Sequence, residues 1–394
     1  MAACSRIPEG QSTPVEYDHS IDTKQEERNS DMPSYLVYIG TYTFSNREPK
    51  SEGVYIYRMD AESGHLTFAG TAKAGENPAF LAIHPNGRYL YAANELMEFQ
   101  GTEGGGVSAL AINPSDGSLS LINQQPSHGG ATCHISLDRT GKYALVANYM
   151  GGNATMLPIL EDGSLAPATS IVQHSGTGPN PQRQEQPHTH SVFIDHENRH
   201  ALVSDLGIDK VMVYQLDLAN GKLQPNQPPF AQVTGGSGPR HLDFHPSGRF
   251  VYLINEMGNT ITAFRYDGEK GELHEIQTVD TLPSDFSGES TCADIHVDPA
   301  GKFVYGSNRG HDSLVIFAID PSTGKLSYVG HESTRGKTPR NFGIEPNGNF
   351  LLAANQDSHT VITYRIDKQS GKLGYLSTTE VPMPVCIKFL RKAS

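Results

Sequence analysis

The most informative stretch of this sequence is LDFHPSGRFVYLIN, residues 242–255, because a close copy of it stands at residues 81–94 as LAIHPNGRYLYAAN. Each copy predicts a short strand, a turn at Pro-x-Gly and a second strand that ends in Asn. A third predicted strand follows, as at residues 261–266, and then a Gly-x-Leu tripeptide introduces a fourth. Four short antiparallel strands in a unit of about 50 residues are typical of one blade of a β-propeller.

The Gly-x-Leu tripeptide marks the number of units, and repeats of this kind must be recognised before domains are assigned. It recurs seven times, with intervals of 53, 46, 58, 50, 53 and 47 residues, at Gly64, Gly117, Gly163, Gly221, Gly271, Gly324 and Gly371. The first unit begins at residues 35–40, which match a second strand, and a candidate for its missing first strand stands at residues 384–389. A C-terminal strand that completes the N-terminal blade would leave no open sheet edge. The sequence therefore predicts an all-β fold, a seven-bladed β-propeller.

The propeller is expected to span residues 34–394 as one domain, preceded by a disordered acidic tail at residues 1–33. Residues 1–31 carry three Arg or Lys against seven Asp or Glu, with few apolar side chains, which is typical of disorder. No apolar run approaches the roughly 18–20 residues of a membrane helix, and the tail lacks the apolar core of a secretory signal. Four cysteines lie far apart without a CxxC pair, so we expect neither a zinc ribbon nor a redox pair but isolated buried thiols in a reducing compartment. These features favour a cytoplasmic protein.

The charge of the chain argues against nucleic acid or an anionic membrane as its main partner. The formal net charge is −13 at pH 7, so an anionic ligand must be met by a local cluster of basic side chains. The sequence contains neither a Gly-x-Ser-x-Gly nucleophile motif nor a phosphate-binding P-loop. A functional site must therefore be sought in the repeat itself.

Alignment of the units brings two sets of positions to one end of the predicted innermost strands. The residues just before the first strand are Ala79, Cys133, His190, Arg240, Ala293, Arg340 and Val385. The residues just after the second strand are Tyr42, Glu95, Tyr149, Leu206, Glu256, Arg309 and Gln356. The two positions are sixteen residues apart in all six complete units. Because equivalent positions of the blades form rings around one axis, we expect these side chains to meet near the axis on one face.

The charged members of both sets form the candidate site, which contains His190, Arg240, Glu256, Arg309, Arg340 and Glu95. A structural position would be expected to repeat one residue type, as the neighbouring Asn position does in five of the seven units. The excess of Arg favours an anionic ligand, since a guanidinium binds phosphate or carboxylate through two parallel hydrogen bonds. His190 and Glu256 are a candidate acid and base, and which does which is open. A structural ion-pair network that fills the channel is the other interpretation.

The polar loop at residues 183–191 adds His188 to the candidate binding residues. Its His-x-His pair can place two imidazoles on one side of an extended segment, a geometry able to hold a metal ion. No third imidazole or acidic cluster accompanies the pair, so we expect no metal and no other cofactor. His134 and Asp294 lie one residue further into their strands and are either ligand-binding or core residues. Cys133 is expected to be a buried, inert thiol rather than a nucleophile.

Several motifs connect this chain to a known family. They are YIGTY (38–42), QRQEQPHTHS (182–191), GPRH (238–241), NE (255–256), ADIH (293–296), SNR (307–309) and PRNF (339–342). Together, over roughly residues 34–390, the chain resembles the lactonase family of seven-bladed propellers. That family includes bacterial cycloisomerase-2-type 6-phosphogluconolactonases and fungal carboxy-muconate lactonizing enzymes.

The resemblance implies metal-independent hydrolysis of a sugar-acid lactone, most often 6-phospho-D-glucono-1,5-lactone of the pentose phosphate pathway. In the muconate branch a His, two Arg and a Glu are the proposed site, and their motifs correspond to His190, Arg240, Arg309 and Glu256 here. We therefore expect a hydrolase with these four as catalytic residues. The residues expected to bind its small anionic lactone are Arg340, His188, Glu95, Asp294 and His134. The oligomeric state is left open.

Three other functions remain open at this point. A cycloisomerase acting on a carboxylated muconate would use the Arg cluster to hold carboxylates. A calcium-dependent gluconolactonase is usually six-bladed, which the seven Gly-x-Leu copies disfavour. A propeller that only binds proteins would be expected to expose aromatic and apolar residues on a rim, whereas the blade ends here carry charges toward the axis.

Overall fold

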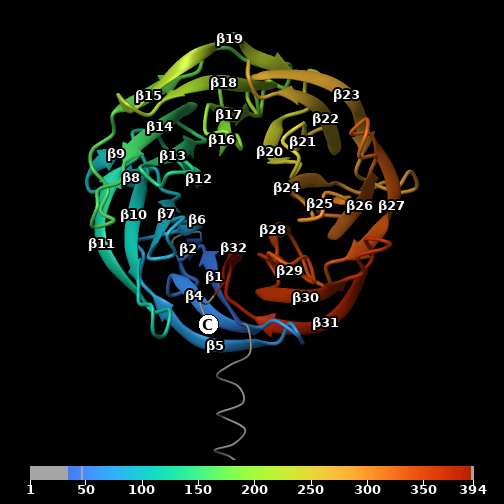
Figure 1. The fold of residues 1–394 in the computed structure, drawn as a ribbon, viewed down its shortest axis with the longest axis horizontal. Coiled ribbons are helices and arrows are strands. Elements are labelled where there is room, and N and C mark those ends of the chain that lie inside the picture. The colour runs from blue at the N-terminus through green and yellow to red at the C-terminus, as the bar shows by residue number, and fades with distance from the viewer. Residues whose placement is uncertain (1–33, 46–47, 392–394) are drawn as a thin grey trace, which may run out of the picture.

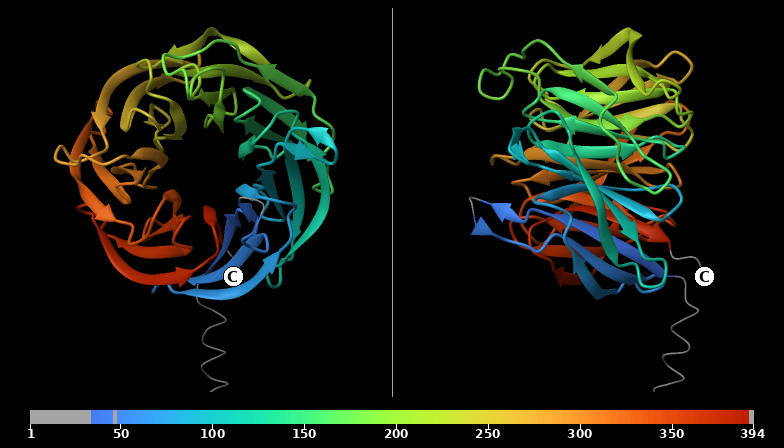
Figure 2. Two further views of the ribbon diagram at one scale, coloured as in Figure 1. Left: turned by 180° about the vertical axis from the view of Figure 1, so that it is seen from behind. Right: turned by 90° about the vertical axis from the view of Figure 1, so that its left-hand side faces the viewer.

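The structure, a computed structural model, describes residues 34–45 and 48–391, which form seven four-stranded sheets arranged as a ring (Figure 1). The side view shows a disc with the blades packed around one axis (Figure 2). Within the described ranges every regular element is a strand, and no helix is long and apolar enough to cross a membrane. The predicted seven-bladed β-propeller is confirmed, whereas the predicted tail at residues 1–33 lies outside the described residues.

Each blade runs from an innermost strand at the axis to an outermost strand at the rim. Given in that order, the strands of blades 1 to 4 are β32 (Pro384–Arg391), β1 (Ser34–Thr41), β4 (Val54–Asp60) and β5 (Leu66–Ala72); β6 (Pro78–Ile83), β7 (Tyr89–Asn94), β10 (Gly106–Ile112) and β11 (Leu119–Pro126); β12 (Thr132–Leu137), β13 (Tyr143–Asn148), β14 (Asn153–Pro158) and β15 (Ser170–Gln173); and β16 (Thr189–Ile194), β17 (His200–Asp205), β18 (Lys210–Asp217) and β19 (Lys222–Gln232). Those of blades 5 to 7 are β20 (Pro239–Phe244), β21 (Phe250–Asn255), β22 (Thr260–Asp267) and β23 (Glu272–Asp280); β24 (Thr291–Val297), β25 (Phe303–Arg309), β26 (Ser313–Ile319) and β27 (Leu326–Ser333); and β28 (Pro339–Ile344), β29 (Phe350–Asn355), β30 (Thr360–Ile366) and β31 (Leu373–Glu380). Two short hairpins follow the second strands of blades 1 and 2, namely β2 (Phe44–Ser45) with β3 (Glu48–Pro49) and β8 (Glu98–Phe99) with β9 (Thr102–Glu103).

Blade 1 is completed by strands from both ends of the chain. β32 pairs antiparallel with β1 along the length of both strands, as predicted from residues 384–389. Val37 and Ile39 of β1 are buried in one cluster with Phe350 and Leu352 of blade 7. Because β32 covers the inner edge of β1, the ring closes without an unpaired strand between its first and last blades.

The Gly-x-Leu repeat has a packing cause, which Gly324 of blade 6 shows most clearly. Its φ is +75°, a left-handed conformation that residues with a Cβ rarely adopt. A Cβ there would lie 2.5 Å from the ring of Phe250 in blade 5, and the Gly324 carbonyl oxygen accepts a 3.0 Å hydrogen bond from the Tyr252 hydroxyl. The other six glycines of the repeat also have positive φ, and each missing Cβ would approach a side chain of the preceding blade to less than 3.0 Å. The repeat therefore marks the contact between successive blades.

A β-bulge lies near the beginning of every innermost strand. In six blades the pairing with the second strand skips one residue, which is Ala79, Cys133, His190, Arg240, Arg340 or Val385. In β24 the irregularity spans Ala293 and Asp294. The prediction that these residues stand just before the strand is therefore wrong, because they are extra residues inside it. A bulge changes the direction in which the extra side chain points. These bulges all lie where the innermost strand of each blade begins.

We predict that replacing Gly324 destabilises the ring far more than replacing a glycine outside the repeat. Gly324→Ala combines a strained φ with a contact to Phe250, so the free energy of unfolding should fall by about 2–5 kcal/mol. Gly330→Ala in β27 of the same blade is the control, because its φ is not positive and its Cβ would meet nothing within 4 Å. Urea denaturation measures both, and equal losses for the two variants would contradict this account of the repeat.

Candidate active site

The face on which the innermost strands begin gathers the charged residues that the repeat predicts. Arg240 is the bulged residue of β20, and His190 is the bulged residue of β16. Glu256 follows β21, and Arg309 is the last residue of β25. Four segments from three neighbouring blades thus converge, and Arg240 and Glu256 are only 2% and 5% exposed.

Glu256 lies at the centre of this cluster. Its Oε2 accepts a 2.9 Å hydrogen bond from Arg240 Nε and lies 2.9 Å from Arg309 Nη2, while Oε1 accepts a 2.7 Å hydrogen bond from Arg183 Nη2. His190 Nε2 is 3.9 Å from Oε2. Burial alone would raise the pKa of Glu256, but the three guanidinium groups outweigh it and hold that pKa well below the usual range. Glu256 is therefore ionised at neutral pH and a weak base.

Arg183 is a site residue that the repeat does not predict. Besides Glu256, its Nη2 contacts the Tyr149 hydroxyl at 3.3 Å, and its side chain is 40% exposed at the rim of the cluster. It belongs to the connection between β15 (Ser170–Gln173) and β16 (Thr189–Ile194), which is longer than the other connections between blades, so alignment of units gives Arg183 no equivalent position. The polar run at residues 183–191 is the one signal that pointed to this loop.

The guanidinium group of Arg240 is held on two sides. Nε donates to Glu256, and Nη1 donates to the Ala293 carbonyl oxygen at 2.5 Å and lies 3.4 Å from His241 Nε2. No residue in the described ranges accepts a hydrogen bond from Nη2. The small cavity beside this group is lined by Ala79, Phe80, Glu95, Cys133, Arg240, His241, Arg340 and Val385. Nη2 is thus the nitrogen of Arg240 left for a ligand.

Arg340, on the same cavity, is held less tightly. Its guanidinium lies over the ring of Tyr42, 5.5 Å from the centroid, and its Nη2 is 3.9 Å from Glu95 Oε2. The Tyr42 hydroxyl donates a 2.7 Å hydrogen bond to that same oxygen. Arg340 makes no hydrogen bond of its own to the described part of the chain, and its side chain is 20% exposed. It therefore keeps its donors for an anionic ligand.

His190 is buried beside Glu256. Its Nδ1 is 3.9 Å from the Cys133 sulfur. Burial, together with the nearby charge of Arg240, lowers the pKa of His190 well below its ordinary value, so the ring is neutral at pH 7 and can accept a proton. Burial also raises the pKa of the Cys133 thiol, which is therefore protonated and fits the expected inert role.

His188 has different neighbours from His190. Its ring stacks on Tyr149 at a centroid distance of 4.5 Å, with Nδ1 3.1 Å from the Tyr149 carbonyl oxygen and Nε2 3.1 Å from Glu185 Oε1. Contact of His188 with a ligand remains a prediction. Over residues 34–45 and 48–391, no group of three or more His, Cys, Asp or Glu side chains is arranged to hold a metal ion.

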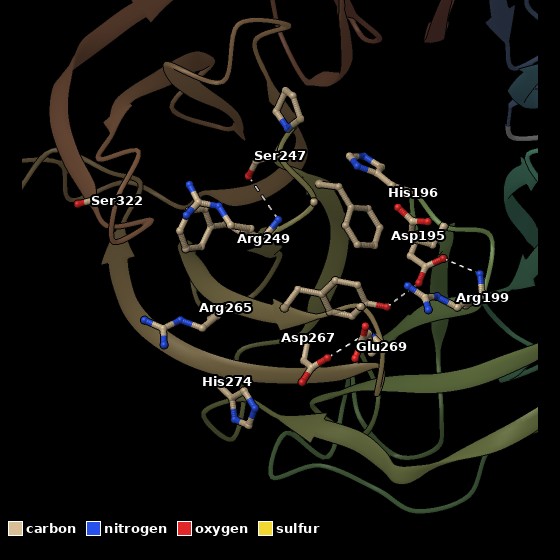
Figure 3. A pocket seen from close by; sticks show the side chains of 17 residues that line it. Asp195, His196, Arg199, Ser247, Arg249, Arg265, Asp267, Glu269, His274 and Ser322 are labelled. Atoms are coloured by element: carbon tan, nitrogen blue, oxygen red, sulfur yellow. Dashed lines mark hydrogen bonds between the residues drawn. The ribbon is translucent and has the colours of Figure 1, made fainter.

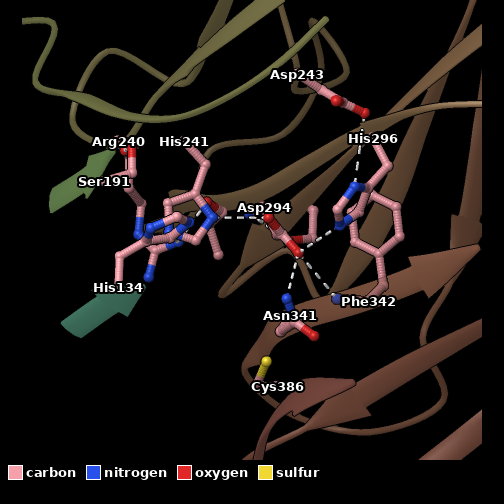
Figure 4. Close-up of polar contacts among 12 residues, drawn as sticks. His134, Ser191, Arg240, His241, Asp243, Asp294, His296, Asn341, Phe342 and Cys386 are labelled. Atoms are coloured by element: carbon pink, nitrogen blue, oxygen red, sulfur yellow. Dashed lines mark hydrogen bonds and ion pairs between the residues drawn. The ribbon is translucent and has the colours of Figure 1, made fainter. Parts of the chain in front are cut away.

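Asp294 is 2% exposed. It lies among His241, His296 and Asn341 (Figure 4). Its Oδ1 accepts a 2.7 Å hydrogen bond from His241 Nδ1, and Oδ2 accepts bonds from His296 Nε2 at 3.1 Å and Asn341 Nδ2 at 2.5 Å. Burial alone would raise the pKa of Asp294, but His296 and the bond from His241 hold it well below its usual value. The carboxylate is thus satisfied within the protein, and direct contact with a ligand remains a prediction.

His134 lies in the same layer as Asp294. Its ring packs between Phe80 and Phe193, at centroid distances of 4.3 and 4.6 Å, and 5.3 Å from the ring of His241. It also lines a cavity formed by the far ends of β6, β12 and β16, away from Glu256. Its role as a ligand-binding residue likewise remains a prediction.

A cavity of about 830 Å³ opens between blades 4 and 5 on the opposite face (Figure 3). Its walls include the turns that follow β16 and β20, whereas the cluster lies where these strands begin. Charges of both signs line it, and some are already paired: Asp195 accepts hydrogen bonds from the Arg199 backbone N–H and the Tyr266 hydroxyl. None of the residues predicted for the site lines this cavity.

We predict that His296 makes stability fall with rising pH. Burial would lower its pKa, but Asp294 and Asp243 raise it from 6.5 to about 10. A raised pKa means that protonated His296 stabilises the fold fully below pH 6.5, and that this contribution is lost as the pH rises toward 10. The free energy of unfolding, from urea denaturation, should therefore fall more steeply over this range in the wild type than in His296→Gln. His274→Gln, at an exposed histidine in β23, serves as control. The same slope in wild type and His296→Gln would contradict the pairing.

Known proteins are similar to this chain in sequence and in overall fold. The family model "Lactonase, 7-bladed beta-propeller" matches residues 36–389. A 6-phosphogluconolactonase of Bacillus subtilis is 38% identical over 363 residues, which cover 92% of this chain and 100% of that protein. A 6-phosphogluconolactonase of Formosa agariphila is 34% identical over 312 residues, 78% of this chain and 86% of that protein.

A solved structure is similar over nearly the whole ring. The periplasmic gluconolactonase of Pseudomonas aeruginosa superposes with a TM-score of 0.84 at 35% sequence identity, covering 91% of this chain and 100% of that one. The family match, the relatives and the solved structure all agree with the family that the sequence motifs suggest. The chain therefore belongs to the lactonase family of seven-bladed β-propellers.

Proposed function

We propose that this protein hydrolyses a sugar-acid lactone, and that its substrate is 6-phospho-D-glucono-1,5-lactone, opened by water to 6-phosphogluconate. Two relatives are named for that activity, and the P. aeruginosa neighbour is a gluconolactonase. The observation that carries the proposal is the axial cluster, in which Arg240 and Arg340 keep donors for an anionic ligand beside the neutral imidazole of His190.

Arg340 is proposed to bind the phosphate. A guanidinium group matches a phosphate through two parallel hydrogen bonds, and Arg340 has no competing hydrogen bond among the described residues. Glu95 lines the same cavity, and its Oε2 accepts a hydrogen bond from Tyr42. Its Oε1 has no partner among residues 34–45 and 48–391, so it can accept a hydrogen bond from a sugar hydroxyl. Arg340 would thus bind the phosphate of a phosphorylated sugar acid, and Glu95 would bind one of its hydroxyl groups.

Arg240 Nη2 is proposed to stabilise the lactone carbonyl oxygen as it becomes negative. Its contacts to Glu256 and Ala293 fix the plane of the guanidinium group before substrate binds. Such preorganised donors act on charge that develops in the transition state, and removal of one costs about 3–4 kcal/mol in other hydrolases. Arg309, bound to Glu256 and to the Cys292 carbonyl oxygen, adds positive charge next to the same position.

His190 is proposed to be the base, and Glu256 the group that orients the arginines. Both groups have lowered pKa values, but both oxygens of Glu256 already accept hydrogen bonds from guanidinium groups, whereas the neutral ring of His190 has an unprotonated nitrogen. As the water oxygen bonds to the carbonyl carbon, a water proton passes to His190. The bond from that carbon to the ring oxygen then breaks, and the ring oxygen takes the proton from His190 to become a hydroxyl group. The carboxylic acid that forms ionises beside the arginines.

We also propose that the protein works in the cytoplasm. Cys133, Cys292 and Cys386 are buried free thiols, which suits a reducing compartment. The P. aeruginosa neighbour is described as periplasmic, so family membership alone does not decide the compartment.

The activity is tested with freshly generated 6-phosphogluconolactone and its unphosphorylated analogue, with and without EDTA, after subtraction of spontaneous opening. We expect the purified protein to open both lactones faster than background, to prefer the phosphorylated one and to be insensitive to EDTA. Arg340→Gln should abolish this preference. Arg365→Gln is the matched control, because Arg365 also lies over an aromatic ring, 4.8 Å from the centroid of Phe350, but on β30 away from the axis.

Absence of catalysis on either lactone would contradict the proposed function. Turnover of a carboxylated muconate instead would assign the arginines to carboxylates, and loss of the rate in EDTA would contradict the metal-independent mechanism. A preference for phosphate that survives Arg340→Gln would remove Arg340 from its role.

We predict that His190→Gln lowers kcat by about 10²–10⁴-fold, the usual range for loss of a general base. His245→Gln is the matched control, since His245 is also buried but lies in the turn after β20 and bonds to the Gly301 carbonyl oxygen. The pH profile adds a second readout: the loss of activity on acidification that reports the His190 proton should disappear in His190→Gln. If His190→Gln kept full turnover while Glu256→Gln lost it together with that acid limb, Glu256 would be the base.

A further inference from the structure

A second ring of side chains lies directly beneath the charged cluster. Its members follow the bulged residues by one position in the innermost strands, and they are Phe80, His134, Ser191, His241, Asp294, Asn341 and Cys386. Several of them form hydrogen bonds with a neighbouring blade, as Figure 4 shows for Asp294 with His241 and Asn341. His241 connects this ring to Arg240, the proposed oxyanion donor, because it contacts both Asp294 and Arg240.

Asp294 is a buried carboxylate, and the positive charge that balances it, on His296, lies beside its Oδ2. His296 Nε2 lies 3.1 Å from Oδ2, and Asp243 Oδ2 lies 3.7 Å from His296 Nδ1. Burial would lower the pKa of His296, but the two carboxylates keep it protonated at neutral pH. The Phe342 backbone N–H and the Asn341 amide also donate to Oδ2. Asp294 is thus fixed and ionised, with Oδ1 left to His241.

This carboxylate determines which nitrogen of His241 carries the proton. The 2.7 Å contact between His241 Nδ1 and Asp294 Oδ1 requires a hydrogen on Nδ1, because an ionised carboxylate can only accept. Burial, with the charge of Arg240, lowers the pKa of His241 to about 4, so the ring is neutral at pH 7. Its Nε2 is therefore an acceptor, 3.4 Å from Arg240 Nη1.

A guanidinium group has only donors, so this tautomer is the one that suits Arg240. A hydrogen on Nε2 would point at the Nη1 hydrogens, and a protonated ring would add a second positive charge beside a buried cation. In the tautomer set by Asp294, Nη1 donates to Ala293 and to His241 while Nε donates to Glu256. These contacts on two sides leave Nη2 without a hydrogen-bond partner among the described residues.

We propose that Asp294 and His241 are positioning residues, which fix the orientation of Arg240 so that its Nη2 meets the lactone carbonyl oxygen. Neither touches the substrate in this account, and the proposal rests on the proposed lactonase function. It also separates Asp294 from the ligand-binding role expected from the sequence.

The kinetic test compares variants at both positions. Asp294→Asn and His241→Leu should lower kcat by about 10²-fold, the scale expected when a reacting group is displaced by about 1 Å. KM should hardly change, because Arg340 and Glu95 still bind the ground state. His241→Gln should recover most of the activity, since its amide N–H can donate to Asp294 while its oxygen accepts from Arg240.

A buried pair elsewhere in the ring provides the matched control. Asp195 and His200 are 1% and 4% exposed, and His200 Nδ1 lies 3.1 Å from Asp195 Oδ2. They lie at the end of blade 4 that is opposite to the charged cluster. Asp195→Asn and Asp294→Asn should both lower the unfolding midpoint, but Asp195→Asn should leave kcat unchanged. Loss of kcat in Asp195→Asn as large as in Asp294→Asn, or full kcat in both His241→Leu and Asp294→Asn, would overturn the proposal.

A spectroscopic readout keeps the proposal separable from the lactonase activity. Nitrogen-15 NMR of histidine-labelled protein, with the His241 signal assigned by its absence in His241→Gln, reports which ring nitrogen is protonated at pH 7. We expect hydrogen on Nδ1 in the wild type and a mixture of tautomers in Asp294→Asn. Hydrogen on Nε2 in the wild type would overturn the proposal even if the lactone is hydrolysed, whereas the expected tautomer without hydrolysis would count against the proposed function alone.

Discussion

The β-bulge at the beginning of each innermost strand is the constraint on which the site depends. A regular strand would alternate its side chains between the two neighbouring blades, where the apolar layers of the core lie. One extra residue, unpaired against the second strand, breaks that alternation and re-aims its side chain at the axial end of the blade. His190, Arg240 and Arg340 all occupy this position, each contributed by a different blade. The ring supplies the geometry, and the residue type at each bulge supplies the chemistry.

Three cations around Glu256 explain how so much charge is tolerated near the axis. A buried carboxylate without partners would be costly, and so would a buried guanidinium. Glu256 shares its oxygens among Arg183, Arg240 and Arg309, so its own charge is more than compensated. The cluster therefore carries a net positive charge, although the formal net charge of the chain is −13. This local positive charge attracts anions to the axial face. Nε and Nη1 of Arg240 are already hydrogen-bonded within the protein, which fixes the position of Nη2. Arg340 lies outside this network, so its donors are the more available ones for binding an anion.

The fold and part of the site could be read from the sequence because both are repeated. The Gly-x-Leu copies fixed the number of blades, since each glycine is required where one blade meets the next. The constant spacing of sixteen residues predicted that Arg240 and Glu256 lie close together, and the structure shows them in contact. Arg183 could not be predicted in the same way, because it lies in the additional length of the β15–β16 connection, which no other unit shares. The Asp294–His241 contact could not be predicted either, because no single residue type repeats through the ring beneath the cluster. Hydrogen bonds between its members also depend on how the bulges set the register.

The most direct test of this account is a crystal structure of the protein with the product, 6-phosphogluconate. The account predicts the phosphate on the Arg340 guanidinium and the carboxylate within hydrogen-bond distance of Arg240 Nη2, with His190 beside it and Glu256 still bound to its three arginines. Product bound on the opposite face, in the cavity between blades 4 and 5, or on the axis with its phosphate on Glu256-bound arginines and Arg340 unused, would contradict it.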